Sequence, residues 1–258
     1  MVRRIFPVIL SLLIAVSGET IRADLVPVIN PGFEDISGET QNNEFTFGPL
    51  TGWDLYDPNN ITSGGEGPTY YIGTLDPTPP DFFNSNPPEG ERVGIAFNFN
   101  GSGDQGEYGL QQTLSSTLSS NTRYTVNVEI GNIGSGTSLS GQFFDLSGFP
   151  GYRVDLLAGS TVVAQDNNSL MDLIPEGEFR TSTFSFVTGQ VHDQLGQQLG
   201  IRLVNLNITD PISNPGADLE VDFDNVRINA FAVPEPNSVF FVVSIAGLTL
   251  IRKRRMTK

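Results

Sequence analysis

Alternation of apolar and polar residues is the feature that most constrains the fold of this chain. Over residues 123–130, apolar side chains occupy every second position, at Tyr124, Val126, Val128 and Ile130. Successive side chains of a strand point to opposite faces, so this pattern predicts a half-buried β-strand. No stretch of comparable length in the body of the chain has the apolar spacing of a helix. The body is therefore expected to be all-β.

Further short strands are indicated by the same pattern. Residues 152–156 and 162–164 flank the turn Ala158-Gly159-Ser160, which predicts a hairpin. Other strands are expected at residues 93–99, 184–186 and 201–203. The chain holds 28 glycines and 17 prolines, which punctuate these strands. The expected architecture is an antiparallel two-sheet β-sandwich of the jelly-roll type.

The last strand of the body changes phase. Leu219, Val221 and Phe223 occupy odd positions, whereas Val226 and Ile228 occupy even ones. A one-residue shift would turn half of this apolar set toward water. The sequence therefore predicts a β-bulge across positions 224–225, which keeps both halves buried.

The charge of the body excludes one class of partner. Between residues 24 and 233 there are 27 acidic residues, six arginines and no lysine, a formal charge of −21. Such a field repels nucleic acid and favours divalent cations. Cysteine is absent, so no disulfide can stabilise the core. The core must be held by the burial of apolar side chains and by any metal ion that binds.

The first residues have the order of a secretory signal peptide. Arg3 and Arg4 precede an apolar run at residues 5–16, and small residues follow up to Ala23. We predict that residues 1–23 are removed during Sec-dependent export. Residues 24–232 then form one β-sandwich domain.

Residues 233–258 read as a second targeting segment. The sequence runs from Val233-Pro234-Glu235-Pro236 through the apolar residues 237–251 to the basic cluster Arg252-Lys253-Arg254-Arg255. The prolines oppose a helix start upstream, and the cations stop transfer across the membrane. Fifteen residues cover about 22 Å as a transmembrane helix, less than a hydrocarbon core of about 30 Å.

This order of parts resembles the PEP-CTERM sorting signal of exported bacterial proteins. The resemblance implies processing by exosortase, transient anchoring in the inner membrane and delivery to the cell surface or extracellular matrix. An unprocessed C-terminal tail anchor is the alternative, because an anchor does not require Pro-Glu-Pro.

Short motifs in the body resemble galactose-binding-like jelly rolls, a set that includes carbohydrate-binding modules. Residues 30–34 (Asn-Pro-Gly-Phe-Glu) are similar to the opening of those domains, and residues 221–228 are similar to their closing strand. Gly52-Trp53 and residues 111–124 match further segments. The resemblance implies a structural Ca²⁺ with Glu34 and Asp224 as ligands, since hard cations prefer oxygen donors. The alternative is that these acids are solvated or bound to turn amides.

Aromatic side chains are the candidates for sugar binding. Sugar faces stack on flat rings, and Tyr56, Tyr70 and Tyr71 lie next to glycine- and proline-rich segments. Trp53, the only tryptophan, is expected in the core instead.

Catalysis has little support in the sequence. His192 is the only histidine, cysteine is absent, and no spacing singles out one pair among the many acids. The chain is therefore predicted to be a non-enzymatic cell-surface or matrix protein, with exopolysaccharide as its candidate partner. Two alternatives stay open: a structural or adhesive matrix protein without glycan recognition, and a polysaccharide hydrolase or lyase.

Overall fold

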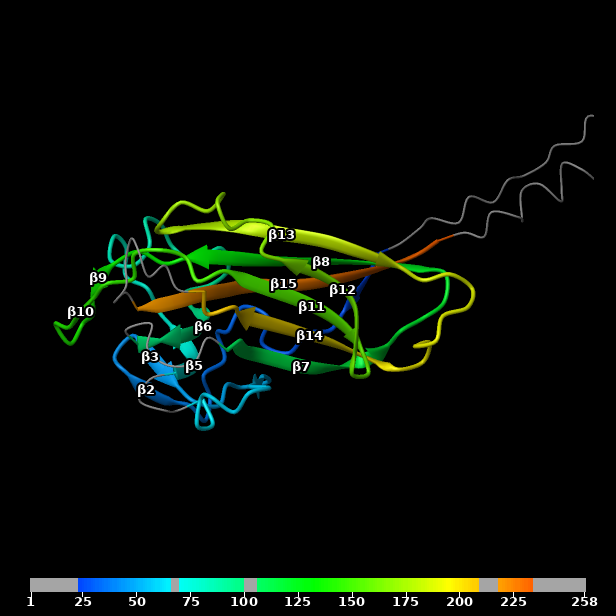
Figure 1. Ribbon diagram of the computed structural model, residues 1–258, viewed down its shortest axis with the longest axis horizontal. Coiled ribbons are helices and arrows are strands. Elements are labelled where there is room, and N and C mark those ends of the chain that lie inside the picture. The colour runs from blue at the N-terminus through cyan, green and yellow to red at the C-terminus, as the bar shows by residue number, and fades with distance from the viewer. Residues whose placement is uncertain (1–22, 66–69, 100–105, 209–217, 234–258) are drawn as a thin grey trace, which may run out of the picture.

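The chain folds into two antiparallel β-sheets that pack face to face (Figure 1). This computed structural model describes residues 23–65, 70–99, 106–208 and 218–233. Within those ranges there is no α-helix, and hence none long and apolar enough to cross a membrane. The all-β prediction is confirmed, and a jelly-roll sandwich fits the observed sheets.

The larger sheet has eight strands, with β15 near its middle. Strand β15 pairs with β8 on one side and with β6 and β1 on the other. Its strands are β1 (Ala23–Val26), β2 (Thr40–Asn42), β3 (Phe45–Phe47), β5 (Tyr70–Leu75), β6 (Val93–Asn98), β8 (Thr122–Asn132), β13 (Glu178–Val187) and β15 (Leu219–Ala232).

The smaller sheet has five strands in the order β12-β11-β14-β7-β4. The predicted hairpin is confirmed, because β11 pairs with β12 from Arg153↔Asn167 to Ala158↔Thr161. A separate two-stranded hairpin joins β9 (Gly136–Thr137) to β10 (Phe143–Phe144) and projects at one end of the molecule (Figure 1). The strands of the smaller sheet are β4 (Asp54–Tyr56), β7 (Tyr108–Thr117), β11 (Tyr152–Ala158), β12 (Thr161–Asn167) and β14 (Gln198–Asn205).

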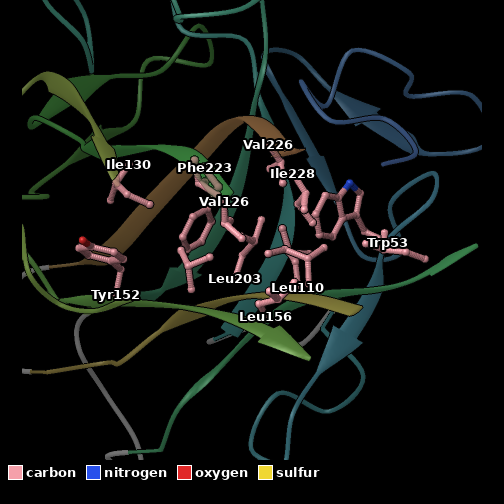
Figure 2. Packing of buried hydrophobic residues seen from close by; sticks show 14 of the residues in the cluster. Trp53, Leu110, Val126, Ile130, Tyr152, Leu156, Leu203, Phe223, Val226 and Ile228 are labelled. Atoms are coloured by element: carbon pink, nitrogen blue, oxygen red, sulfur yellow. The ribbon is translucent and has the colours of Figure 1, made fainter. Parts of the chain in front are cut away.

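The main core lies between the two sheets. Figure 2 shows Val126 of β8 and Phe223 of β15 facing Leu110, Leu156 and Leu203 of the smaller sheet. All five are fully buried, as alternation with a period of two requires of the inward face. Removal of this apolar surface from water is the main force that holds the sheets together.

Trp53 belongs to this core, as predicted. Its ring stacks on Phe33 with 5.3 Å between ring centroids, and its Nε1 donates a hydrogen bond to the carbonyl of Asn30 at 3.1 Å. The Trp53 indole therefore holds the opening segment, which contains Asn30 and Phe33, against the sandwich.

The predicted bulge in β15 is confirmed. The pairing of β15 with β8 shifts register between Asp224 and Arg227, and Asn225 adopts a φ of 50°. Asparagine tolerates this left-handed conformation better than most residues. Val226 then donates its N–H to the Pro31 carbonyl at 3.0 Å, and its side chain stays buried with Ile228.

Candidate functional site

The outer face of the larger sheet is covered by a second apolar cluster. Phe82 and Phe83, from the connection between β5 and β6, are buried against this face, and Phe144 of β10 packs on the same cluster. The sheet face beneath them is built by Leu75, Val93, Ile95, Phe97 and Ile133. The larger sheet is therefore buried on both faces in this region, which a simple two-layer sandwich does not require.

A cavity of about 350 Å³ opens within this second cluster. Its aromatic walls come from Phe45 and Phe47 of β3, Tyr71 of β5, Phe97 of β6 and Phe144 of β10. Tyr71 and Phe97 stack with 5.5 Å between ring centroids. The tip of the β9–β10 hairpin and the turn between β2 and β3 supply polar lining residues. Mostly apolar walls with a few polar groups are typical of small-molecule sites.

One acid of β15 lines the cavity, and a second lies beside it in the strand. Glu220 pairs with Phe97 across the β15–β6 ladder, and Phe97 in turn pairs with Tyr71. Asp222, two residues along the same face, is opposite Ile95. Glu220 is 3% exposed and Asp222 is fully buried. The sheet thus places a pair of carboxyl groups at an aromatic wall.

Burial changes the protonation of this pair. Burial is the largest of the effects that raise the pKa of Glu220 to about 8. A side-chain hydrogen bond to Asp222 lowers this pKa, and the nearby charge of Asp218 raises it further. Burial also raises the pKa of Asp222 well above its usual range. Among the described residues, Glu220 Oε1 and both oxygens of Asp222 have no donor.

A shared proton accounts for these observations together. Two carboxyl groups form a hydrogen bond with each other only when at least one is protonated. A protonated Asp222 can donate to Glu220, and a protonated Glu220 can donate into the cavity. The arrangement can therefore supply a proton to an apolar ligand at neutral pH.

The structure brings the predicted metal ligands Glu34 and Asp224 to one region. Glu34 Oε1 accepts the backbone N–H groups of Glu91 and Arg92, each at 2.8 Å, and Asp224 Oδ2 accepts the N–H of Glu89 at 2.7 Å. Burial raises the pKa of Asp224 to about 8, helped by the charges of Glu89 and Glu34 and opposed by the backbone donors.

Calcium at this position remains a prediction. A buried carboxylate with two acidic neighbours suits a hard cation. Within the described ranges, however, no three His, Cys, Asp or Glu side chains are arranged to hold a metal ion. The Pro31 carbonyl already accepts the Val226 N–H, and the Glu34 and Asp224 oxygens already accept backbone donors.

Two of the three candidate tyrosines, Tyr56 and Tyr71, lie on different sheets and do not form one site. Tyr71 lines the aromatic cavity. Tyr56 lies on the smaller sheet, where its hydroxyl donates to Glu107 Oε1 at 2.6 Å and its ring faces the Arg202 guanidinium at 4.0 Å. Tyr70 begins β5, and its side chain lies outside the described part of the structure.

The targeting segments are not described either. Residues 1–22 and 234–258 lie outside the described ranges, so the signal peptide, Pro234-Glu235-Pro236, the transmembrane helix and the basic residues 252–255 stay predictions. Val233, at the edge, donates its N–H to the carbonyl of Asn121 at 2.7 Å.

Sequence reasoning missed Glu220 and Asp222. In the sequence these two acids alternate with Leu219, Val221 and Phe223, and that pattern alone assigns them no role. The chain has 18 phenylalanines, and many of them lie outside the strands predicted to face the core. Because such side chains need a second place to be buried, their number was the available signal for a second apolar cluster.

Comparison with known proteins gives a family. The sequence model of the HpiC1-like cyclases, described as HpiC1 cyclase, matches residues 24–229. A crystal structure of a cyclase from Fischerella sp. TAU is 39% identical, with 83% of this chain and 100% of that chain covered and a TM-score of 0.67. No curated protein matches this chain.

Two further structures from the same source contain small molecules. The Stig cyclase Fisc in complex with (3Z)-3-(1-methyl-2-pyrrolidinylidene)-3H-indole is 38% identical, with 83% of this chain and 100% of that chain covered and a TM-score of 0.67. A cyclase in complex with 4-(1H-indol-3-yl)butan-2-one is 37% identical, with 82% and 100% covered and a TM-score of 0.67.

These matches correct several predictions. The identification as a PEP-CTERM protein with a carbohydrate-binding body is wrong, because the body matches cyclases along nearly its whole length. The non-enzymatic surface or matrix role is wrong for the same reason, since the matched proteins are enzymes. The absence of cysteine and the presence of a single histidine misled the sequence interpretation, because general acid catalysis requires neither residue. The chain belongs to the HpiC1-like cyclase family.

Proposed function

We propose that this chain is a cyclase that closes a ring in an apolar, indole-bearing substrate, with Glu220 as the proton donor. The observation that carries the proposal is the buried Glu220 at the wall of an aromatic cavity, with Asp222 behind it. A carboxyl group that is still protonated near pH 8 can act as a general acid at neutral pH.

The proposed reaction is an isomerisation. Glu220 transfers its proton to a π-bonded carbon of the substrate, and the resulting cation is attacked by a second π bond, which forms the new ring bond. Loss of a proton from the cyclised cation to the Glu220 carboxylate restores the acid, so no atom is gained or lost. The protonated Asp222 can stabilise the transient Glu220 carboxylate by a hydrogen bond.

The aromatic walls have two tasks in this scheme. The faces of Phe45, Phe47 and Tyr71 present negative π density, which attracts a developing carbocation. The same rings exclude water, which would otherwise trap the cation as an alcohol. The indole part of the proposal is supported by the indole compounds in two related cyclases.

The proposal is tested by incubating the purified protein with indoles that carry an unsaturated side chain. We expect a product of unchanged mass that has one ring more and one C=C bond fewer, seen by mass spectrometry and NMR. Binding of such indoles without any isomerised product at any pH between 5 and 8 would contradict the cyclase activity.

We also propose that Ca²⁺ binds at Glu34 and Asp224 and stabilises the junction of the opening segment with β15. An ion that binds only the folded state at a hundred times its Kd contributes about 2.7 kcal/mol. Removal of calcium by a chelator should then lower the Tm by about 5–10 °C for a domain of this size.

Asp224→Ala should remove this chelator effect, whereas Asp54→Ala, an exposed acid on β4, should preserve it. Differential scanning calorimetry with and without chelator is the measurement. An unchanged Tm in the wild-type protein would show that the metal assignment is wrong.

Export also stays a proposal for this enzyme. It depends on residues 1–23, whose charged, apolar and small-residue regions are those of a secretory leader.

A further inference from the structure

We propose that Glu44 is a specificity-determining residue of the same cavity, and that its Oε2 accepts a hydrogen bond from an N–H group of the substrate. This inference rests on the proposed function and extends it, because it selects substrates that carry a nitrogen donor. Glu44 takes no part in the proposed proton transfer, which involves Glu220 and Asp222, so the role proposed for Glu44 is in binding.

Glu44 is held in the turn between β2 and β3 with its side chain at the cavity. It is 5% exposed and is one of the lining residues. Its Oε1 accepts the backbone N–H of Leu139, at the tip of the β9–β10 hairpin, at 2.8 Å. Its Oε2 is buried and has no hydrogen-bond partner among the described residues. One carboxylate oxygen is therefore fixed, and the other is an acceptor without a donor in a residue that lines the cavity.

An unpartnered buried carboxylate oxygen is energetically unfavourable. Burial of an acceptor without a donor typically costs about 1–3 kcal/mol, and more for a charged group. A ligand with an N–H group in the cavity would remove that cost, whereas a purely hydrocarbon ligand would leave it. The Glu44 Oε2 acceptor thus favours a ligand with an N–H group over a hydrocarbon ligand of similar shape.

Glu44 and Glu220 differ in their surroundings, which separates their tasks. Asp222 adjoins Glu220 and interacts with it side chain to side chain. Glu44 instead accepts a backbone N–H from the hairpin with its Oε1. The geometry suits Glu220 as proton donor and Glu44 as hydrogen-bond acceptor.

The hairpin fixes the position of this acceptor. Ser138 and Gln142, which flank Leu139, also line the cavity, and the Ser138 hydroxyl donates to the Gln142 carbonyl at 3.1 Å. The carboxylate of Glu44 is therefore oriented before the ligand arrives, which lowers the entropy lost on binding.

A 1H-indole fits these requirements. Its flat face can stack on the aromatic walls near Tyr71 and Phe97, and its N–H lies at the ring edge, where a single acceptor can reach it. The predicted ligand class is thus an aromatic heterocycle with a free ring N–H, rather than any apolar ring of the same size.

The test measures binding of two ligands to the full chain by calorimetry: 4-(1H-indol-3-yl)butan-2-one and its 1-methyl derivative. We expect the wild-type protein to prefer the N–H compound by about tenfold in Kd, the value of one hydrogen bond to a charged group. Glu44→Gln should bind both compounds equally. Its amide oxygen can still accept the Leu139 N–H, which turns the amide NH₂ toward the ligand.

The Gln variant separates hydrogen bonding from crowding, because its side chain has almost the same volume as Glu. If the extra methyl group merely collides with the wall, the tenfold preference will persist in Glu44→Gln, and that result would overturn the proposal. Equal binding of both compounds by the wild-type protein would overturn it as well.

Two controls complete the design. Glu176→Gln, an exposed acid outside the cavity, should keep the tenfold preference. Glu44→Ala should lose the preference and also weaken the hairpin contact, seen as faster amide exchange at Leu139. Failure of the wild-type protein to bind either indole would contradict the proposed indole substrate itself, a result distinct from binding without preference.

Discussion

Replacement of Glu220 by glutamine should reduce turnover by about 10²- to 10⁴-fold, the usual contribution of a general acid. Glutamine has nearly the same size but carries no transferable proton, so the cavity and its aromatic walls stay in place. Binding of 4-(1H-indol-3-yl)butan-2-one should therefore persist while isomerisation is lost. Glu178→Gln, on an exposed position of β13, should leave turnover unchanged.

The same variant should make the protein more stable at neutral and alkaline pH. The folded-state pKa of Glu220 is about 8, above the ordinary value of 4.5. Its stabilising contribution is thus complete below pH 4.5 and is lost as the pH rises through 8. Glu220→Gln removes this loss, which amounts to about 3 kcal/mol at pH 7.

Chemical unfolding at pH 4.5 and pH 8 measures this effect. Glu220→Gln should unfold at higher denaturant concentration than the wild-type protein at pH 8 and at a similar concentration at pH 4.5. Wild-type turnover should fall as the pH rises past 8, because the acid becomes ionised. Turnover that keeps rising through pH 9 would argue against Glu220 as the acid.

Asp166→Ala should destabilise the fold by about 3–5 kcal/mol. Asp166 of β12 is buried where the edge strands of the two sheets meet, and its Oδ2 accepts the hydroxyls of Tyr152 and Ser182 at 2.6 and 2.5 Å. Ser169 donates both its hydroxyl and its N–H to the same carboxylate. Alanine would leave the buried Ser182 hydroxyl without this acceptor and would leave the Tyr152 hydroxyl with only the Ser169 hydroxyl at 3.4 Å, which is the costly case.

The pH dependence of Asp166 has the opposite sign to that of Glu220. Burial alone would raise its pKa, but the hydroxyl donors, Ser182 first, outweigh burial and lower it. This stability is therefore present above pH 3.8 and is lost as the pH falls through the lower folded-state pKa. Urea unfolding of Asp166→Ala beside Asp172→Ala, an exposed neighbour, measures the effect. Equal stability of the two variants would refute the cross-sheet role.

The fold could be predicted from the sequence because its main core obeys a local rule. Strands β8, β11 and β15 place alternate apolar residues between the sheets, so each pattern is readable within one strand. The bulge at Asn225 was readable for the same reason, since the phase of the pattern changes there.

The site could not be read in this way, because it depends on contacts between distant segments. Glu220 and Asp222 are on the face that a two-layer sandwich would expose to water. They are buried only because Phe82, Phe83 and Phe144 cover that face from connecting segments. The alternation of apolar and polar residues within β15 gives no indication of this covering layer.

The function was misassigned for a related reason. The motifs at residues 30–34 and 221–228 describe how the opening segment and the closing strand meet, and unrelated activities can share such a junction. The proposed chemistry lies instead at the aromatic cavity, where the closing-strand motif contributes Asp222 but contains neither Glu220 nor the aromatic walls. The charge of the body predicts only that nucleic acid is not a partner, and it does not indicate the reaction.

The central claim is that Glu220 is a neutral acid at pH 7. ¹³C NMR of the side-chain carboxyl groups tests it directly, with the Glu220 signal identified by its absence in Glu220→Gln. We expect this signal to titrate with a midpoint near 8 and to report a protonated carboxyl group at pH 7. A midpoint near 4.5, with the group fully ionised at pH 7, would contradict the account.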